Sequence, residues 1–181
     1  MLSITKNITT IIFIALGWIF FEAINRIYFD FLKISDSFYL IYWLSGLRLV
    51  AILLFEMLGF YGLFLGYVIG TLLFRNFSTF DALCLGFLTS LAPLLAYKIW
   101  IKYLKGTAHF YNFNFTELCY LVFLHSILTA IFRNAFFLLT NKLSGLDQIL
   151  TTFTANVIGT FLFLYVLKIS HRVFIAINVK K

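Results

Sequence analysis

The stretch that decides the fold is Trp43–Phe74, which reads WLSGLRLVAILLFEMLGFYGLFLGYVIGTLLF. It is almost entirely apolar, yet it carries one arginine, Arg48, and one glutamate, Glu56. A membrane helix needs only about 20 apolar residues to cross about 30 Å of hydrocarbon. A single helix over 38–74 would be about 55 Å long at about 1.5 Å per residue. We therefore predict two membrane helices joined by a tight turn near Leu58–Gly59.

The composition excludes a water-soluble domain. Of the 181 residues, 62% are hydrophobic, 20% are aromatic and only 12% are charged. A soluble domain is about 45–50% apolar and about 25% charged. The net charge of +7 does not indicate nucleic acid, because the basic residues lie mainly in short loops and at the ends of apolar runs, as membrane topology requires. We expect membrane lipids, and no nucleic acid, around this chain.

The apolar runs predict an all-α fold, a polytopic transmembrane bundle of about six helices that fills residues 1–181 as a single integral membrane domain. The predicted spans are Thr9–Ile27, Phe38–Leu58, Gly59–Phe74, Phe80–Ile101, Phe115–Thr140 and Gly145–Val173. A polar loop is expected at Lys102–Asn114. The first span lacks a small-x-small cleavage site, so we interpret it as a retained helix. One unbroken helix over 38–74 would leave five spans.

The distribution of lysine and arginine predicts the orientation. With six spans, most basic residues fall on the side of the two termini, and cytoplasmic loops are the ones enriched in Lys and Arg. On that side lie Lys6, Lys98, Lys102, Lys105, Lys168, Arg172, Lys180 and Lys181, and on the other Arg26, Lys33, Arg75 and Lys142. The bias predicts a multi-pass membrane protein with both termini in the cytoplasm.

Charged side chains inside the predicted spans are the first candidates for a functional site. Arg48 lies deep in the second span, where a charge costs about 2.5–3.5 kcal/mol on insertion scales. Arg133 is the other deep base, and Glu22 and Glu56 are candidate acidic partners. Three interpretations stay open for Arg48: an ion pair that fixes helix packing, a polar pocket for an anionic or zwitterionic ligand, or snorkelling to the interface.

Uncharged polar groups add to this candidate site. A helix that starts at Ser45-Gly46 could present free backbone donors to an anion, although glycine is also common inside membrane helices. His125 is either a hydrogen-bonded packing residue or a proton-sensitive group. Asn156 belongs to a strip of threonines whose hydroxyls can also bond their own backbone. We predict a ligand pocket lined by Arg48, Glu56, His125, Arg133 and Asn156.

A glycine ridge follows the predicted turn. Gly62, Gly66 and Gly70 recur every four residues, after Gly59, and ridges of this kind let membrane helices approach closely. The ridge predicts close helix packing, either inside this chain or with a protein partner or second copy of the chain.

Motifs for catalysis and metal binding are missing from the sequence. It holds no evident nucleophile–base pair, phosphate-binding loop or dinucleotide fingerprint. Cys84 and Cys119 both fall in apolar runs without paired spacing, which is typical of small buried hydrophobic residues. His125 has no second buried histidine to help hold a haem. We expect no metal, no cofactor and no enzyme.

The segment Tyr42-Trp43-Leu44-Ser45-Gly46-Leu47-Arg48, followed by an apolar helix and then Gly62-Leu63-Phe64-Leu65-Gly66, resembles the membrane-associated sensor 1 domain. The later Asn156-Val157-Ile158-Gly159 is similar to that family's Gly-Asp-x-x-Gly element, with Asn156 at the acidic position and no proline near Leu44. The family has about eight spans and a soluble output module, against about six here. The resemblance implies a bacterial inner-membrane sensory or ligand-binding bundle that acts through a partner.

The size and span number are also similar to the substrate-capture subunits of energy-coupling-factor transporters, a likeness of architecture alone. Two functions therefore stay open after the sequence: a sensor-like ligand-binding bundle, and a small substrate-capture or accessory subunit of a membrane transporter or larger complex.

Overall fold

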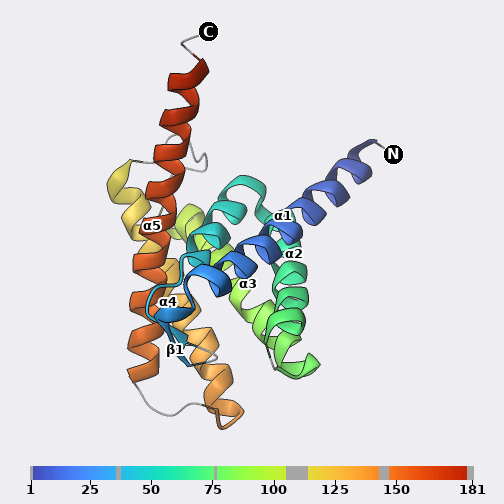
Figure 1. Ribbon diagram of the computed structural model, residues 1–181, viewed down its shortest axis with the longest axis vertical. Coiled ribbons are helices and arrows are strands. Elements are labelled where there is room, and N and C mark those ends of the chain that lie inside the picture. The colour runs from blue at the N-terminus through green and yellow to red at the C-terminus, as the bar shows by residue number, and fades with distance from the viewer. Residues whose placement is uncertain (1, 36–37, 76, 105–113, 143–146, 179–181) are drawn as a thin grey trace.

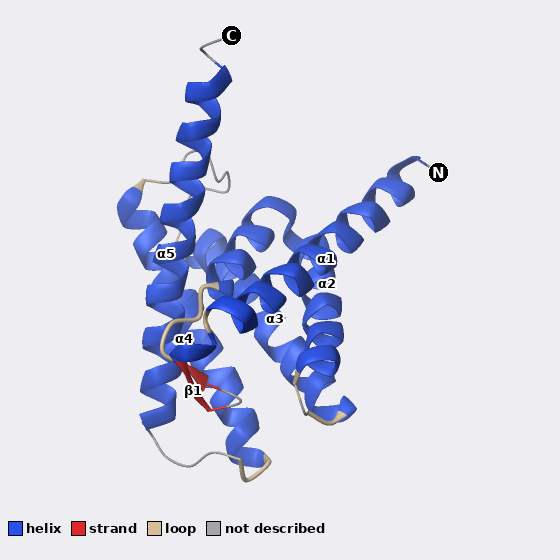
Figure 2. Ribbon diagram, in the orientation of Figure 1, coloured by secondary structure: helices blue, strands red, loops and turns tan. Residues whose placement is uncertain are grey.

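The computed structural model describes residues 2–35, 38–75, 77–104, 114–142 and 147–178 (Figure 1). The long elements are all helices, with one short pair of strands between the first two (Figure 2). They are α1 (Leu2–Tyr28), η1 (Asp30–Leu32), β1 (Lys33–Ser35), β2 (Phe38–Tyr39), α2 (Leu44–Phe74), α3 (Thr79–Tyr103), α4 (Phe115–Leu139) and α5 (Asp147–Asn178). The all-α class is confirmed, but these residues form five long helices and not the predicted six.

The difference in number arises within α2, which contains both the second and the third predicted spans. Its backbone leaves helical geometry at Glu56, where φ is 45° and ψ is −114°. The chain reverses there, because Gly59 packs directly on Ala51, which would lie far from it along a straight helix. A Cβ on Gly59 would overlap the Ala51 backbone. The predicted turn at Leu58–Gly59 therefore exists, two to three residues earlier, and it carries a residue at a φ that favours glycine.

The reversal places both ends of the bundle on the same side. In Figure 1 the start of α1, the bend of α2 and the last turns of α5 all lie toward the upper end of the molecule. The segment before Glu56 would rise only about 18 Å from Leu44, and the one after it about 27 Å, at about 1.5 Å per residue. The first segment is therefore too short to cross a membrane, and it begins inside the bundle.

The segment that leads into α2 is not helical, so the prediction of a span from Phe38 was wrong. β1 and β2 form an antiparallel pair, and the helix begins only at Leu44. Irregular backbone at membrane depth is tolerated where protein covers it. Here the Tyr42 N–H donates to the Ala155 carbonyl of α5 (3.1 Å), and a Cβ on Gly159 would overlap the Tyr42 carbonyl. α5 thus supplies the cover.

The glycine ridge is packed against α1 of the same chain. A Cβ on Gly62 would lie 2.6 Å from the Ile14 side chain, and one on Gly66 would lie 2.9 Å from the Ala15 carbonyl oxygen. Gly70 differs, because a Cβ there would meet Trp18 at an ordinary 3.6 Å. The first two glycines therefore let α1 and α2 touch through their backbones, whereas the third does not.

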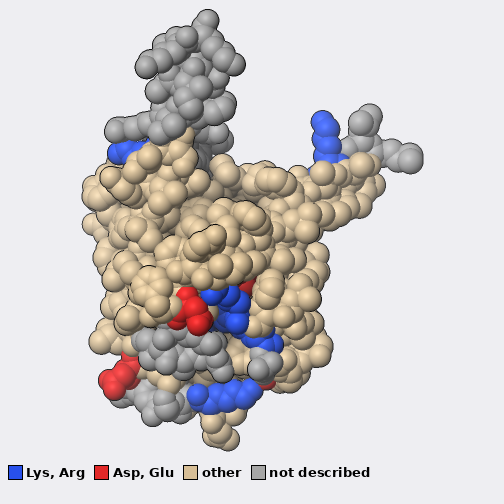
Figure 3. Space-filling model, in the orientation of Figure 1, with Lys and Arg blue, Asp and Glu red and all other residues tan. Residues whose placement is uncertain are grey.

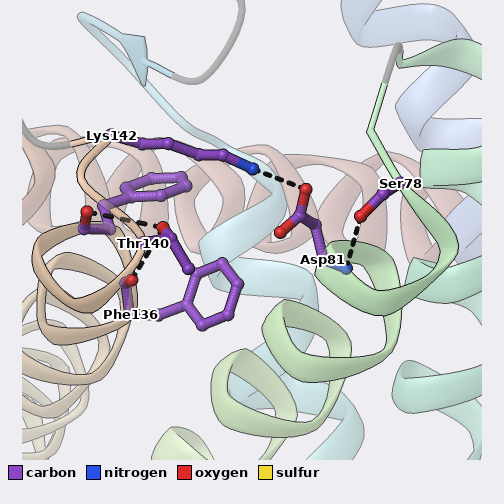
Figure 4. A network of polar contacts seen from close by, with 6 residues as sticks. Ser78, Asp81, Phe136, Thr140 and Lys142 are labelled. Atoms are coloured by element: carbon purple, nitrogen blue, oxygen red, sulfur yellow. Dashed lines mark hydrogen bonds and ion pairs between the residues drawn. The ribbon is translucent and has the colours of Figure 1, made fainter.

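The helix ends opposite the bend are fixed by side chains. The Ser78 hydroxyl accepts a hydrogen bond from the Asp81 N–H (3.1 Å) and caps α3, as Ser does at many helix starts. Lys142, just after α4, donates to the Asp81 carboxylate at 2.6 Å, and the Thr140 hydroxyl bonds the Phe136 carbonyl (Figure 4). This ion pair ties the start of α3 to the end of α4.

The surface of the long helices is compatible with a multi-pass membrane protein. All five long helices are long and apolar enough to cross a membrane. On the face shown in Figure 3 the charged side chains lie in the lower part and near the upper ends, with a broad uncharged region between. Large apolar side chains such as Phe13, Ile131 and Leu139 point outward. Outward-facing apolar side chains of this kind are typical of helices that face lipid.

Candidate functional site

The most unusual feature of the interior is the environment of Arg48. Its side chain is only 1% exposed, and its guanidinium carbon lies 4.9 Å from the ring centre of Trp18, 5.2 Å from that of Tyr42 and 5.6 Å from that of Tyr67. The rings come from α1, from the segment before α2 and from the second half of α2. Three aromatic faces can stabilise a buried cation, each by up to about 2 kcal/mol when desolvated.

The rings do not satisfy the hydrogen-bonding groups of Arg48. Neither of its terminal nitrogens, Nη1 and Nη2, has a hydrogen-bond partner among the described residues. A buried donor without a partner costs about 1–3 kcal/mol, and more when it is charged. Arg48 therefore presents both terminal nitrogens of its guanidinium, unused, in the interior of the protein.

An ion pair lies beside this arginine. Arg75 donates to Glu22 Oε1 from Nε (3.0 Å) and from Nη2 (2.6 Å), and both side chains are buried. Arg26, at the edge of the cluster, approaches the same oxygen at 3.7 Å. Burial alone would lower the pKa of Arg75, but the Glu22 carboxylate, together with nearby Tyr67 and Tyr42, raises that pKa well above its usual value. The pair joins α1 to the end of α2.

Tyr67 connects the two arginines. Its ring lies 5.6 Å from the guanidinium carbon of Arg48 and 6.0 Å from that of Arg75. The Tyr67 hydroxyl, Arg75 Nη1 and Glu22 Oε2 are all buried, and none has a hydrogen-bond partner among the described residues. The cluster thus contains more unused donors than unused acceptors.

Tyr42 touches both this cluster and a neighbouring cleft. Its ring centre lies 5.2 Å from the guanidinium carbon of Arg48, and its phenol hydroxyl can donate a hydrogen bond. That hydroxyl too is buried without a partner in the described structure. The other side of Tyr42 lines a narrow cleft, together with Tyr39, Arg133, Thr152, Ala155 and Asn156.

The cleft holds two of the residues predicted from the sequence. Arg133 of α4 and Asn156 of α5 are both buried, and the Arg133 guanidinium carbon lies 5.4 Å from the Phe137 ring. Arg133 also interacts electrostatically with Arg48 and Arg75, so its positive charge adds to the same region. The structure therefore brings Arg48, Arg133 and Asn156 to adjoining positions.

His125 lies next to Arg48 in a separate hydrogen-bond network. Its Nε2 is 3.0 Å from the Ser45 hydroxyl and its Nδ1 is 3.3 Å from the Thr129 hydroxyl. Thr160 of α5 completes the network, 2.9 Å from the Ser45 hydroxyl. The sequence did not reveal this Ser–His contact, because the two residues are 80 positions apart. The Thr129 hydroxyl, and not a carboxylate, therefore orients Nδ1 of His125.

The start of α2 does not offer free backbone donors at Ser45-Gly46, which was one of the two interpretations left open by the sequence. The Ser45 N–H donates to the Tyr42 carbonyl and the Gly46 N–H to the Trp43 carbonyl, both at 3.0 Å. The turn before the helix satisfies both groups, so the interpretation as an ordinary glycine within a membrane helix fits better. Gly46 is instead needed for close packing, since a Cβ there would overlap the Phe163 side chain.

Glu56 is the predicted site residue that the structure keeps away from the others. It accepts a hydrogen bond from the Tyr97 hydroxyl (3.2 Å) and lies 3.7 Å from Lys98 Nζ, with its side chain 52% exposed. Its contacts are with α3, at the bend of α2, whereas those of Arg48 are with α1 and Tyr67. The reversal at Glu56 carries the carboxylate to the end of the bundle.

The sequence analysis missed several residues of the cluster. Trp18, Tyr42 and Tyr67 had no distinguishing signal among the many aromatic residues, and Arg75 was interpreted only as the end of a span. Glu22 was named, but its partner was not. Within the part of the chain that the structure describes, no three His, Cys, Asp or Glu residues are grouped so that they could hold a metal ion.

Comparison with known proteins found no relative of this chain. No protein-family model matches the chain, and no match was found among curated proteins or among solved structures. The function is therefore argued from the geometry around Arg48.

Proposed function

We propose that this chain is an integral inner-membrane protein whose helical bundle binds an anionic ligand at the Arg48 cluster and acts, in a sensor-like manner, through a protein partner. The observation that carries this proposal is the buried guanidinium of Arg48 with both terminal nitrogens unpartnered in the described structure. An anion would supply the acceptors and the charge that the three aromatic rings do not.

The surroundings of the cluster support an anion over a cation or a neutral molecule. Arg48 and Arg75 outnumber the single carboxylate Glu22 there, and Arg133 adds positive potential. In a low-dielectric interior such charges interact more strongly than in water. Because the cluster joins α1, α2 and the segment before α2, a bound anion could change how these elements pack, which is one way to transmit binding to a partner.

We propose a structural role and not catalysis for Ser45 and His125. A hydrolytic serine needs a histidine as its general base. A third group, usually a carboxylate, must orient that histidine and stabilise its imidazolium form. Here Nδ1 of His125 faces the neutral Thr129 hydroxyl, and both Ser45 and His125 are completely buried. The network is better suited to holding α2, α4 and α5 together beneath Arg48.

The proposed orientation has both ends of the bundle in the cytoplasm. In Figure 1 the start of α1 and the end of α5 lie at one end of the molecule, and Lys6, Lys98, Lys102 and Lys168 belong to the elements that end or turn there. Cytoplasmic ends are enriched in lysine and arginine.

The first test is a thermal-unfolding screen of the purified full chain in lipid nanodiscs. Anionic, zwitterionic, neutral and cationic compounds are compared at equal ionic strength. A ligand at about 100 times its Kd stabilises the folded state by about 2.7 kcal/mol, which raises the midpoint of unfolding. We expect stabilisation by anionic compounds, loss of that effect in Arg48→Gln, and no loss in Lys98→Gln, which removes a charge from an exposed position.

Two outcomes would contradict the proposal: stabilisation by cationic or neutral compounds only, or an Arg48→Gln variant that folds and still responds to anions. Gentle purification from the native membrane, followed by mass spectrometry, addresses the alternative of a substrate-capture or accessory subunit. A stoichiometric ATPase pair would favour a transport role for the same anion site.

A further inference from the structure

We propose that the ligand group recognised by the Arg48 cluster is a phosphate-type oxyanion, with Arg48 binding two of its oxygens and Arg75, Tyr67 and Tyr42 the third. This inference rests on the proposed function and gives its ligand a chemical class. It follows from the number and kind of unused polar atoms in the cluster.

Five buried donor atoms of the cluster have no partner among the described residues. They are Arg48 Nη1, Arg48 Nη2, Arg75 Nη1, the Tyr67 hydroxyl and the Tyr42 hydroxyl. Their side chains touch one another, because the Tyr67 ring contacts both guanidiniums and the Tyr42 ring contacts that of Arg48. Glu22 Oε2 is the unused acceptor beside them.

This donor set exceeds what a carboxylate can satisfy well. The two oxygens of a carboxylate match one guanidinium fork in a bidentate contact. Bound to Arg48 in that way, a carboxylate would leave Arg75 Nη1 and the tyrosine hydroxyls without an oxygen of their own. A phosphate group has three terminal oxygens that accept strongly, so a third oxygen is available to these donors.

The ion pair explains why Arg75 can take part. Glu22 Oε1 occupies Nε and Nη2 of Arg75 and leaves Nη1 unused. The Glu22 carboxylate would repel an approaching anion, and its pairing with Arg75 and proximity to Arg26 reduce that repulsion. Glu22 thus acts as a positioning residue that fixes Arg75 without using all its donors.

Trp18 provides a built-in reporter of binding. It is one of three tryptophans, it is buried, and its ring centre lies 4.9 Å from the guanidinium carbon of Arg48. Replacing Trp43 and Trp100 by Phe leaves Trp18 as the source of indole fluorescence. Trp43 packs edge-to-face on Phe21, so Phe is a conservative replacement there.

The experiment titrates this single-tryptophan full-length protein in phosphatidylcholine nanodiscs with inorganic phosphate and with acetate, at constant ionic strength. A parallel sample is made in nanodiscs that contain phosphatidic acid, whose headgroup is a phosphate monoester. We expect phosphate to change Trp18 fluorescence with a Kd at least tenfold below that of acetate, or phosphatidic acid to produce the same change. The first result identifies a soluble phosphate compound as the source and the second a lipid headgroup.

Variants separate recognition from folding. Arg48→Gln should lose the response, and Arg48→Lys, which keeps the charge but not the fork, should weaken it at least tenfold. Tyr67→Phe keeps the ring and removes one donor, so it should weaken the phosphate response at least threefold and leave the acetate response unchanged. A purely structural role of Tyr67 would not distinguish the two anions.

The failures are distinguishable. Acetate binding as tightly as phosphate, or Tyr67→Phe weakening both equally, would overturn the phosphate inference and leave the anion site in place. No response to phosphate, acetate or phosphatidic acid would overturn the inference, and with a negative thermal screen it would overturn the proposed function as well.

Discussion

At the scale of single residues, the most unusual feature of the interior is its buried arginines. Aromatic rings stabilise one of them, and a carboxylate stabilises another. Arg48 depends on Trp18, Tyr42 and Tyr67, whereas Arg75 depends on Glu22. The two solutions differ physically. Aromatic rings stabilise the charge of a guanidinium without accepting hydrogen bonds from its N–H groups. A carboxylate stabilises the charge and also accepts those hydrogen bonds. For this reason Arg48 is the better candidate for ligand contact, and Arg75 the better structural link.

The Glu22–Arg75 pair gives a prediction for stability. Removing one partner of a buried ion pair costs about 3–5 kcal/mol, because the other charge stays buried. We expect Glu22→Gln to lower the free energy of unfolding by about that amount. Arg75→Gln should cost less, because Arg26 already lies 3.7 Å from Glu22 and can partly replace Arg75. Unfolding in mixed detergent micelles measures both.

The double variant Glu22→Gln/Arg75→Gln should cost clearly less than the sum of the single changes, since no charge is then left alone. Glu56→Gln is the matched control, as its contact with Lys98 is solvent-exposed and should contribute at most about 1 kcal/mol. Additive losses in the cycle would show that the pair does not act as a unit.

At the scale of elements, α1 and α2 are joined by direct backbone contact. Gly62 and Gly66 have no room for a side chain, because Ile14 and Ala15 of α1 lie where a Cβ would be. A protein partner or second copy of the chain would therefore need a surface other than this occupied part of the ridge. Glu56 adds a second constraint, since its positive φ at the reversal is a conformation usually left to glycine.

A matched pair of substitutions tests this contact. Gly66→Ala should destabilise the protein by about 1–3 kcal/mol, because the methyl group forces α1 away from α2. Gly17→Ala, on α1 itself, should be neutral or slightly stabilising, as nothing lies within 4 Å of the added carbon and alanine is the better helix former. Equal midpoints of thermal unfolding for the two variants would argue against the close approach.

At the scale of the whole molecule, the reversal in α2 sets the topology. It makes the chain pass up and down the bundle with both of its ends on one side, as Figure 1 shows. The polar cluster depends on the same reversal, since Arg48 and Tyr67 belong to the two arms of α2 and face one another across it.

Cysteine labelling in intact cells tests the topology. In a Cys84→Ala/Cys119→Ala background, single cysteines replace Lys6, Asp30, Thr79 or Tyr103, all exposed in the structure. A membrane-impermeant maleimide should label Asp30→Cys and Thr79→Cys from outside, and Lys6→Cys and Tyr103→Cys only after the cells are opened. If α2 crossed as one straight helix, Lys6→Cys would instead share its side with Thr79→Cys.

Sequence alone was enough to predict an all-helical chain with the composition of a membrane protein, the approximate positions of most of the long helices, and that Arg48 is unusual in an apolar run. These follow from local hydrophobicity and from the cost of a buried charge, which depend on neighbours in the chain. Even the turn within Trp43–Phe74 was predictable, to within a few residues, because one straight helix would be too long.

The surroundings of Arg48, in contrast, depend on the tertiary structure. The three rings around it come from positions 18, 42 and 67. Arg75 pairs with the carboxylate of Glu22, and Ser45 contacts a histidine 80 residues away in the sequence. The tertiary structure also removed Glu56 from the predicted pocket. Packing of distant segments sets such contacts, and periodicity along the chain carries no information about which polar group of one helix will face which group of another.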